Sequence, residues 1–256
     1  MKKLAIIAAA ILALSSCSAL SKINWNEAQL AQAATTALTA ASISDAQVIA
    51  LSQKTVAELD AQNKLASETY QQRLGRLLAD IPDVEGLKIN YKVYETNEVN
   101  AFACGDGSIR VYSGLMDVMD DSELMAIIGH ECGHVVHQDT KKAMRSAYLA
   151  AAAREAIGAA GGTIGALSNS VLGDIGESFI SSQYSQKQEF EADEYGYKFS
   201  TEHGFSPYSM CNALEKLVRL AGSSQSSIVQ KMFASHPDSA ERAKRMRAKA
   251  DATQGK

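Results

Sequence analysis

The 256-residue sequence has no excess of positive charge, because 25 Lys and Arg stand against 29 Asp and Glu, a formal charge of -4. Basic residues also form no long block. The densest group, Lys244-Arg245-Met246-Arg247, is interpreted as a solvated helix end whose cations complement the helix dipole. The sequence therefore gives no reason to expect a nucleic-acid partner.

Internal repeats and a linker between folded parts are also lacking. With 46% hydrophobic and 21% charged residues, the chain can bury one substantial core and is not disordered. We expect one folded domain over residues 27–256, with a helical part at 27–82 and a catalytic core at 83–256. Helical patterns outnumber strand patterns, so the predicted fold class is α+β, mostly helical with a small antiparallel sheet.

No apolar run near the N-terminus is long enough to span a bilayer comfortably. The run Ala5–Leu14 follows Lys2 and Lys3 and leads into Leu14-Ser15-Ser16-Cys17. This arrangement resembles the bacterial lipoprotein signal, in which the Cys carries the lipid. A plain secretory peptide is the alternative, but a Cys directly after small residues favours lipidation. We expect a signal peptide at 1–16 and a lipidated tether at 17–26.

Cysteine is scarce, with four residues, and the first of them, Cys17, is treated separately from the other three. Ser18, rather than an Asp, follows Cys17 and resembles the outer-membrane sorting pattern of enterobacteria. We therefore expect anchoring to the outer membrane of a Gram-negative bacterium, on the periplasmic side, by several acyl chains. Cys104, Cys132 and Cys211 then remain, so at least one is free or pairs with another chain. All three are interpreted as small apolar side chains of the core.

The remaining elements follow from periodicity and turn signals. Ser44 and Gln47 form a capping box for one helix, and a second helical pattern ends at Pro82. Leu87–Tyr94 alternates as a half-buried strand, and Ser108–Tyr112, after the turn Cys104–Gly107, is expected to be its antiparallel neighbour. Further helix starts are predicted at Asp120 or Asp121, near Gln183, at Ser206-Pro207 and at Pro237. The stretch Ala147–Ala166 contains charged residues and is not interpreted as a membrane span.

The segment His130-Glu131-Cys132-Gly133-His134 points to a metal site. Its two histidines are four residues apart, so both imidazoles project from one helical face about 6 Å apart along the axis and can meet one zinc ion. Glu131 lies at the edge of that face, where it can take a proton from water instead of ligating. Gly129 and Gly133 weaken a helix, so we expect a backbone or ligand to approach there.

A catalytic zinc ion needs a third protein ligand, and two candidates exist. His137 shares the stripe but lies about 10.5 Å along the axis from His130, so it is better interpreted as a surface or supporting histidine. Glu189 and Asp193 share a face of a later helix. Glu189 could complete the coordination, while Asp193 could accept the second N–H of a ligand histidine. The alternative, an acidic solvated helix face, is less favoured beside the histidine motif.

Several motifs together carry a family resemblance. In chain order they are Asn100-Ala101-Phe102, Ser113-Gly114-Leu115-Met116, the His130–His134 helix, Glu189-Phe190-Glu191-Ala192-Asp193 and His236-Pro237. Their order resembles that of the HtpX-like zinc metallopeptidases of the gluzincin type, over almost the full chain. The resemblance implies a zincin-type domain and peptide-bond hydrolysis.

The resemblance also implies roles for individual residues. It implies His130, His134 and Glu189 as the ligands of one zinc ion, and Glu131 as the catalytic base. Asp193 would be an orienting residue or proton donor. Two positions depart from the pattern of many relatives: Gln186 stands where they have Arg, and Asp139 where they have His.

The expected substrates are unfolded or damaged envelope proteins. The strand Ser108–Tyr112 is expected to lie along the cleft and bind an extended peptide through main-chain hydrogen bonds. Arg110 and Tyr112 are interpreted either as substrate contacts or as ordinary exposed strand residues. His236 either steadies the oxyanion or blocks the open metal position.

Two other functions compete with a protease. One is an envelope chaperone or assembly factor with weak or conditional proteolysis, in which the Ala/Gly-rich stretch acts as a lid. The other, a purely structural zinc site, is weak because such sites usually use four ligands rich in Cys.

Overall fold

The computed structural model describes residues 44–143, 145, 146, 149, 150, 183–237 and 239–254, together with 28, 31, 34, 37 and 42. The chain divides into two compact units, and the unit Ile43–Arg145 with Leu172–Lys256 holds every element discussed below. The expected signal peptide, the tether with Cys17 and most of the Ala/Gly-rich stretch lie outside the described residues. Among the helices of the described residues, none has the length and apolar character needed to cross a membrane.

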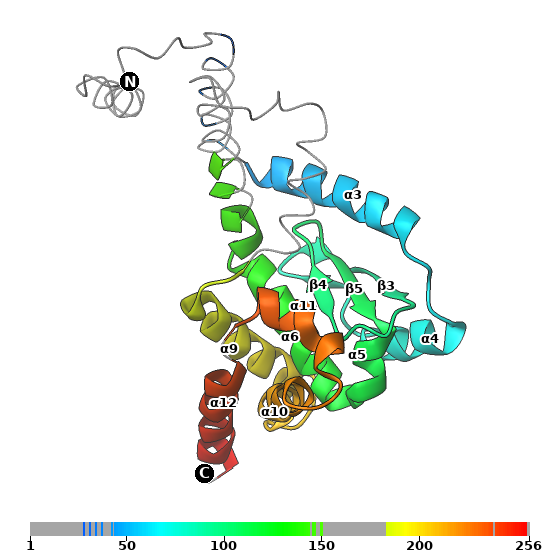
Figure 1. Ribbon diagram of the computed structural model, residues 1–256, viewed down its shortest axis with the longest axis vertical. Coiled ribbons are helices and arrows are strands. Elements are labelled where there is room, and N and C mark those ends of the chain that lie inside the picture. Colours follow the sequence, from blue (N-terminus) through cyan, green and yellow to red (C-terminus); the bar gives the residue numbers. More distant parts are fainter. Residues whose placement is uncertain are drawn as a thin grey trace, which may run out of the picture. The chain divides into compact units, whose positions relative to one another are not determined.

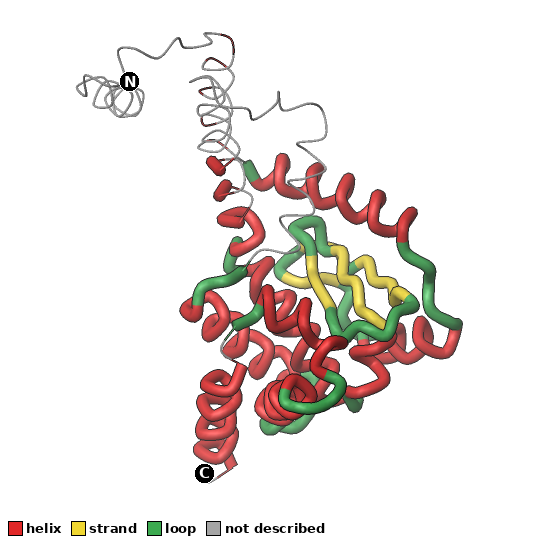
Figure 2. The backbone as a smooth tube through the Cα atoms, viewed as in Figure 1, coloured by secondary structure: helices red, strands yellow, loops and turns green. Residues whose placement is uncertain are grey.

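The larger sheet of the described chain has three strands in the order β3-β5-β4. The central strand β5 (Ser108–Tyr112) is parallel to β3 (Asn90–Tyr94) and antiparallel to β4 (Ala101–Ala103). A small hairpin of β1 (Asp83–Val84) and β2 (Leu87–Lys88) precedes it. Figure 2 shows the strands in yellow among the surrounding helices. The predicted α+β class is confirmed.

The predicted antiparallel pairing of Leu87–Tyr94 with Ser108–Tyr112 was wrong. The turn Cys104–Gly107 joins β5 to β4 rather than to β3, and β4 spans only three residues, too few for a clear periodic pattern. β3 pairs with the other edge of β5 and runs in the same direction. The predicted first strand is also interrupted at Ile89. The sheet is therefore mixed.

Two helices precede the sheet in the described chain. Helix α3 (Asp45–Gln62) begins at the predicted capping box, in which the Ser44 hydroxyl accepts from the N–H of Gln47. It is followed by α4 (Glu68–Leu77). In Figure 1, α3 runs along one side of the sheet, where it contacts β5. The capping-box prediction is confirmed.

The most buried helix of the described residues is α6 (Asp121–Val136), which follows the short α5 (Ser113–Val118). Asp120, one of the two predicted caps, is its N-cap, and it forms a capping box with Glu123. One side of α6 packs on β4 and the other on α9 (Gln186–Glu202). Helix α9, which carries Glu189 and Asp193, therefore lies directly beside α6, which carries His130 and His134 (Figure 1).

The C-terminal part is a series of helices. They are α10 (Ser209–Ala221), a 3₁₀ turn η2 (Ser226–Val229), α11 (Gln230–Ser235) and α12 (Ser239–Gln254). The predicted starts of α9, α10 and α12 lie within three residues of the observed ones. η2 and α11 were not predicted, because each is too short to show a helical period.

Glycines let α6 and α9 approach closely. A Cβ on Gly129 would lie 2.7 Å from the ring of Phe199, and one on Gly196 would lie 2.6 Å from the Ala126 carbonyl oxygen. A Cβ on Gly133 would lie 3.0 Å from Cα of Ala192. The expectation that a backbone or ligand approaches these glycines is confirmed at Gly133, where the Ala192 backbone lies close, whereas at Gly129 the Phe199 side chain approaches instead. These contacts set the distance between the two helices.

A buried ion pair joins α3 to the sheet. Arg110 is 1% exposed and donates to both carboxylate oxygens of Asp60, at 2.8 and 3.0 Å. Lys92 and Tyr94 donate to the same carboxylate, at 2.7 and 2.6 Å. Burial by itself raises the pKa of Asp60, but these hydrogen bonds outweigh it and hold the pKa well below its usual range. Both interpretations of Arg110, substrate contact and exposed strand residue, were therefore wrong.

We predict that Asp60→Ala destabilises the fold by about 3–5 kcal/mol, because it leaves the Arg110 guanidinium buried and unpaired. Urea unfolding of the purified protein measures the change. Glu95→Ala is the matched control, since Glu95 pairs with Lys64 at the surface and its loss should cost less than about 1 kcal/mol.

The same pair predicts a pH dependence. Because the pKa of Asp60 is lower in the folded state, its contribution is present above the unfolded value of about 3.9 and declines as pH falls toward the folded value. The stability difference between wild type and Asp60→Asn should shrink between about pH 5 and pH 2. A difference that stays constant over this range would contradict the assignment.

We predict that Gly196→Ala separates α6 from α9. Its Cβ would meet the Ala126 carbonyl oxygen at 2.6 Å and the His130 nitrogen at 2.9 Å, and neither backbone atom can move alone. The expected cost is about 1–3 kcal/mol, with weaker metal binding, measured by thermal unfolding with and without zinc. Gly222→Ala is the control, because its nearest neighbours lie 3.8 Å away. Equal behaviour of the two variants would refute this packing argument.

Candidate metal centre

Three buried side chains from two helices converge on one point. His130 and His134 of α6 bring their Nε2 atoms to 3.1 Å from each other. Glu189 of α9 places Oε1 3.4 Å from His134 Nε2 and Oε2 3.7 Å from His130 Nε2. All three side chains are at most 3% exposed. The capping box of α9, with Ser185 as N-cap, places Glu189 in the first turn of that helix.

His236 is a fourth member of this cluster. It follows α11, and its Nδ1 lies 3.1 Å from Glu189 Oε1 and 3.3 Å from His130 Nε2. One donor atom from each of His130, His134, Glu189 and His236 lies within 4.8 Å of the others. His137 is the C-cap of α6 and lies outside the cluster, with its ring against Tyr195.

Each helix histidine is held by a carboxylate on its other nitrogen. Asp193 Oδ1 lies 2.9 Å from His130 Nδ1, and Asp139 Oδ2 lies 3.1 Å from His134 Nδ1. A neutral imidazole that donates from Nδ1 has a lone pair on Nε2. The two Nε2 lone pairs and the Glu189 carboxylate therefore face one another.

The cluster fits a metal ion by its donor chemistry. With both Nε2 atoms unprotonated, the three groups present lone pairs to one another at 3.1–3.7 Å in a buried site, an arrangement that a cation between them would stabilise. Two imidazole nitrogens with one carboxylate are a donor set that suits a catalytic zinc ion. The chain can therefore hold a metal ion at His130, His134 and Glu189, with His236 as a further donor.

Arg242 of α12 balances the negative charge of α9. It donates to both oxygens of Asp193, at 2.8 and 2.6 Å, and forms a close ion pair with Glu189. Burial raises the pKa of Asp193 by itself, but the charge and hydrogen bonds of Arg242 lower it. Arg242 was not predicted from the sequence, although it lies in the first turn of the helix that follows His236-Pro237. Asp139 was noted there only as a departure from relatives.

Glu131 faces the cavity rather than the cluster. It is 4% exposed, and its Oε1 lies 3.6 Å from His236 Nε2. Burial raises the pKa of the Glu131 carboxyl to about 7, with a further contribution from the charge of Glu189. Burial, together with the charge of Arg242, lowers the pKa of His130 to about 3. A carboxyl with a pKa near neutrality can both take and return a proton.

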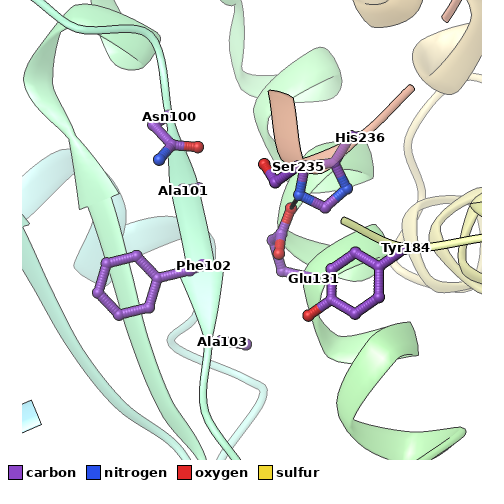
Figure 3. Close-up of a pocket in the computed structure, with 8 residues that line it drawn as sticks. All are labelled: Asn100, Ala101, Phe102, Ala103, Glu131, Tyr184, Ser235 and His236. Atoms are coloured by element: carbon purple, nitrogen blue, oxygen red, sulfur yellow. Dashed lines mark ion pairs between the residues drawn. The ribbon is translucent and has the colours of Figure 1, made fainter. Parts of the chain in front are cut away.

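The cavity beside Glu131 is narrow. Figure 3 shows it between strand β4 on one side and Glu131, Tyr184 and His236 on the other. Its volume of about 10 Å³ accommodates about one water molecule. Tyr184 stacks on the His134 ring at 3.8 Å, and its N–H donates to the Ser235 carbonyl oxygen at 3.2 Å.

The strand along this cavity is β4, not the predicted strand Ser108–Tyr112. β5 is paired on both edges and has no free edge for a peptide. The residues that line the cavity from the strand side are Asn100, Ala101, Phe102 and Ala103. Of the proposed substrate contacts, Tyr112 is half-buried and Arg110 is committed to Asp60.

The cysteines of the described chain do not add to the site. Cys104, Cys132 and Cys211 are free and buried. Burial raises the pKa of Cys132 to about 12, so its thiol stays protonated. The prediction that these residues fill the core is confirmed, whereas Cys17 lies outside the described residues.

Comparison with known proteins agrees with this geometry. The profile described as peptidase family M48 matches residues 65–250. Metalloprotease LoiP of Escherichia coli (strain K12) is 45% identical over 214 residues, covering 82% of this chain and 83% of that protein. Metalloprotease YcaL of the same strain is 40% identical over 211 residues, covering 81% and 82%. A protease HtpX homolog of Ralstonia nicotianae is 27% identical over 173 residues, covering 60% and 59%.

The profile match covers most of the chain and includes the residues of both helices that form the cluster. The resemblance to HtpX-like metallopeptidases is therefore confirmed. From the match and the buried donor set together, the chain belongs to peptidase family M48 and is a metalloendopeptidase.

Proposed function

We propose that the chain is a zinc-dependent endopeptidase of the bacterial envelope that cleaves unfolded or damaged envelope proteins. The observation that carries the zinc assignment is the convergence of His130 Nε2, His134 Nε2 and Glu189 Oε1 in a buried site. Two imidazoles and one carboxylate leave positions for water and substrate, unlike the closed sites of structural zinc. Both relatives with the highest identities above are described as metalloproteases.

Bound zinc would polarise the scissile carbonyl and lower the pKa of a water molecule. Glu131 takes the proton of the attacking water and returns it to the leaving amine. Its raised pKa, about 7, suits both steps at neutral pH. Asp193 keeps the His130 ring oriented, and Arg242 keeps Asp193 charged. Asp193 thus acts as an orienting residue in this proposal and not as a proton donor.

An extended peptide would bind along β4. The bonds from Tyr112 N–H to the Asn100 carbonyl and from Cys104 N–H to the Ser108 carbonyl show which residues of this strand point toward β5. Because antiparallel pairs alternate, the N–H and C=O groups of Ala101 and Ala103 point the other way, toward the cavity. The cavity holds about one water molecule, so a peptide binds only after Tyr184 and Ser235 separate from β4.

Because a peptide binds only after the cavity opens, the narrow cavity also supports the second candidate, a chaperone or assembly factor with conditional proteolysis. His236 fits either of its proposed roles. Its Nε2 faces Glu131, where it can donate to an oxyanion, while its Nδ1 faces the metal donors and can occupy the open position.

For location, we propose a signal peptide at 1–16, a tether at 17–26 and one metallopeptidase domain at 27–256. Cys17 would carry the lipid and hold the domain on the periplasmic side of the outer membrane. Growth with an alkyne palmitate analogue should label the wild type in the outer-membrane fraction and leave Cys17→Ala unlabelled. Equal labelling of the two proteins would exclude this anchor.

We predict that Glu131→Gln binds zinc as tightly as wild type. Its rate of cleavage of an unfolded, fluorescently labelled protein should fall by at least about 100-fold, because the amide cannot take a proton. Zinc content is measured in the same preparation. Cleavage at the wild-type rate would rule out Glu131 as the base. In cells, full resistance of the Glu131→Gln strain to envelope stress would favour the chaperone candidate.

His236→Ala extends the same experiment. Lower cleavage with unchanged zinc content assigns His236 to the oxyanion, whereas higher cleavage assigns it to blocking. Unchanged cleavage contradicts both roles. Lys231→Ala, a change on the exposed side of α11, is the matched control and should leave cleavage unaltered.

A further inference from the structure

A second carboxylate besides Asp193, that of Asp139, contacts a proposed metal donor on its far side. Asp139 Oδ2 lies 3.1 Å from His134 Nδ1, and both side chains are at most 1% exposed. We propose that Asp139 is a positioning residue that aims His134 at the metal ion and increases its donor strength. This inference rests on the proposed zinc-dependent function.

The two oxygens of Asp139 are divided between partners. Oδ1 accepts from Lys142 Nζ at 2.7 Å and from Gln188 Nε2 at 2.9 Å. Oδ2 faces the His134 ring. Because Asp139 is 0% exposed, bulk water does not compete for Oδ2. The carboxylate is therefore held from one side and is available to His134 on the other.

The backbone before Asp139 adopts an uncommon conformation to bring it there. Gln138 has φ 58°, in the left-handed region that residues other than glycine rarely adopt. Its N–H donates to the Val135 carbonyl, and the His137 N–H donates to the Gly133 carbonyl. This left-handed turn ends α6 and reverses the chain, so that Asp139 returns to the ring of His134.

The consequence for His134 is a fixed ring. Donation from Nδ1 to Asp139 leaves the lone pair on Nε2, which faces Glu189 Oε1 at 3.4 Å. Tyr184, stacked on the ring at 3.8 Å, limits its tilt. A carboxylate on the far nitrogen also raises the basicity of a ligand imidazole. Asp193 stands in the same relation to His130.

The test measures zinc affinity of the full-length protein after metal removal, by competition with a coloured chelator. Asp139→Ala should raise the zinc dissociation constant about 10- to 100-fold. Asp139→Asn should raise it less, because the amide oxygen can still accept from His134. The Co²⁺-loaded forms should show shifted absorption bands in both variants, a change that loss of stability alone does not cause.

Two variants serve as controls. Asp45→Asn removes a mostly exposed carboxylate that pairs with Lys141 and should leave zinc affinity unchanged. Gln138→Gly keeps the left-handed turn at lower cost, so it should keep wild-type affinity without loss of thermal stability. Asp45→Asn tests whether the loss of any carboxylate lowers zinc affinity, and Gln138→Gly tests whether a change in the turn does so.

A zinc dissociation constant within twofold of wild type for Asp139→Ala would overturn the proposal. If that variant fails to fold, folded Asp139→Asn with wild-type affinity and an unshifted Co²⁺ spectrum would overturn it instead. Cleavage by wild type is measured alongside. A wild type that binds zinc but does not cleave contradicts the proposed function only, whereas unchanged Asp139 variants of a cleaving enzyme contradict this inference only.

Discussion

The structure depends on one electrostatic constraint, the convergence of two imidazole nitrogens and one carboxylate in a buried site. The Nε2 atoms of His130 and His134 and the Glu189 carboxylate lie 3.1–3.7 Å apart, and all three groups are acceptors when both Nε2 atoms are unprotonated. Such an arrangement is costly in a low-dielectric interior without a cation. The surrounding protein is built to hold these atoms in place, through carboxylates behind the histidines and a guanidinium, that of Arg242, behind the glutamate.

Helix spacing is the second requirement of this site. At their crossing, α6 and α9 lie closer than a Cβ at three positions would allow. Gly129 and Gly133 on α6, and Gly196 on α9, remove the obstructing atoms at the crossing. Glycine weakens a helix by about 1 kcal/mol. Three glycines at the crossing therefore lower the stability of the two helices and allow α6 and α9 to lie closer together. Packing and chemistry are thus linked at the same turns.

Sequence patterns predicted the parts of the site that depend on local spacing. The helical pairs His130/His134 and Glu189/Asp193 follow from four-residue intervals, and the start of α6 follows from the predicted cap at Asp120 or Asp121. Contacts between distant segments left no such pattern. Arg242 meets Asp193 only through the packing of α12 on α9, and β4 is too short for periodicity to reveal it. Because β4 was not predicted, both the predicted sheet pairing and the predicted strand along the cleft were wrong.

The two histidine anchors differ in their exposure to solvent. Arg242, behind Asp193, is 2% exposed, so this pair acts at low dielectric and is little affected by salt. Lys142, behind Asp139, is 57% exposed, so salt screens its charge and water hydrates it. Gln188 adds a neutral hydrogen bond to Asp139 that salt does not screen. Because Gln188 also belongs to the capping box of α9, the start of that helix and the orientation of His134 depend on each other. The ion pair behind His130 is therefore screened less by salt than the ion pair behind His134.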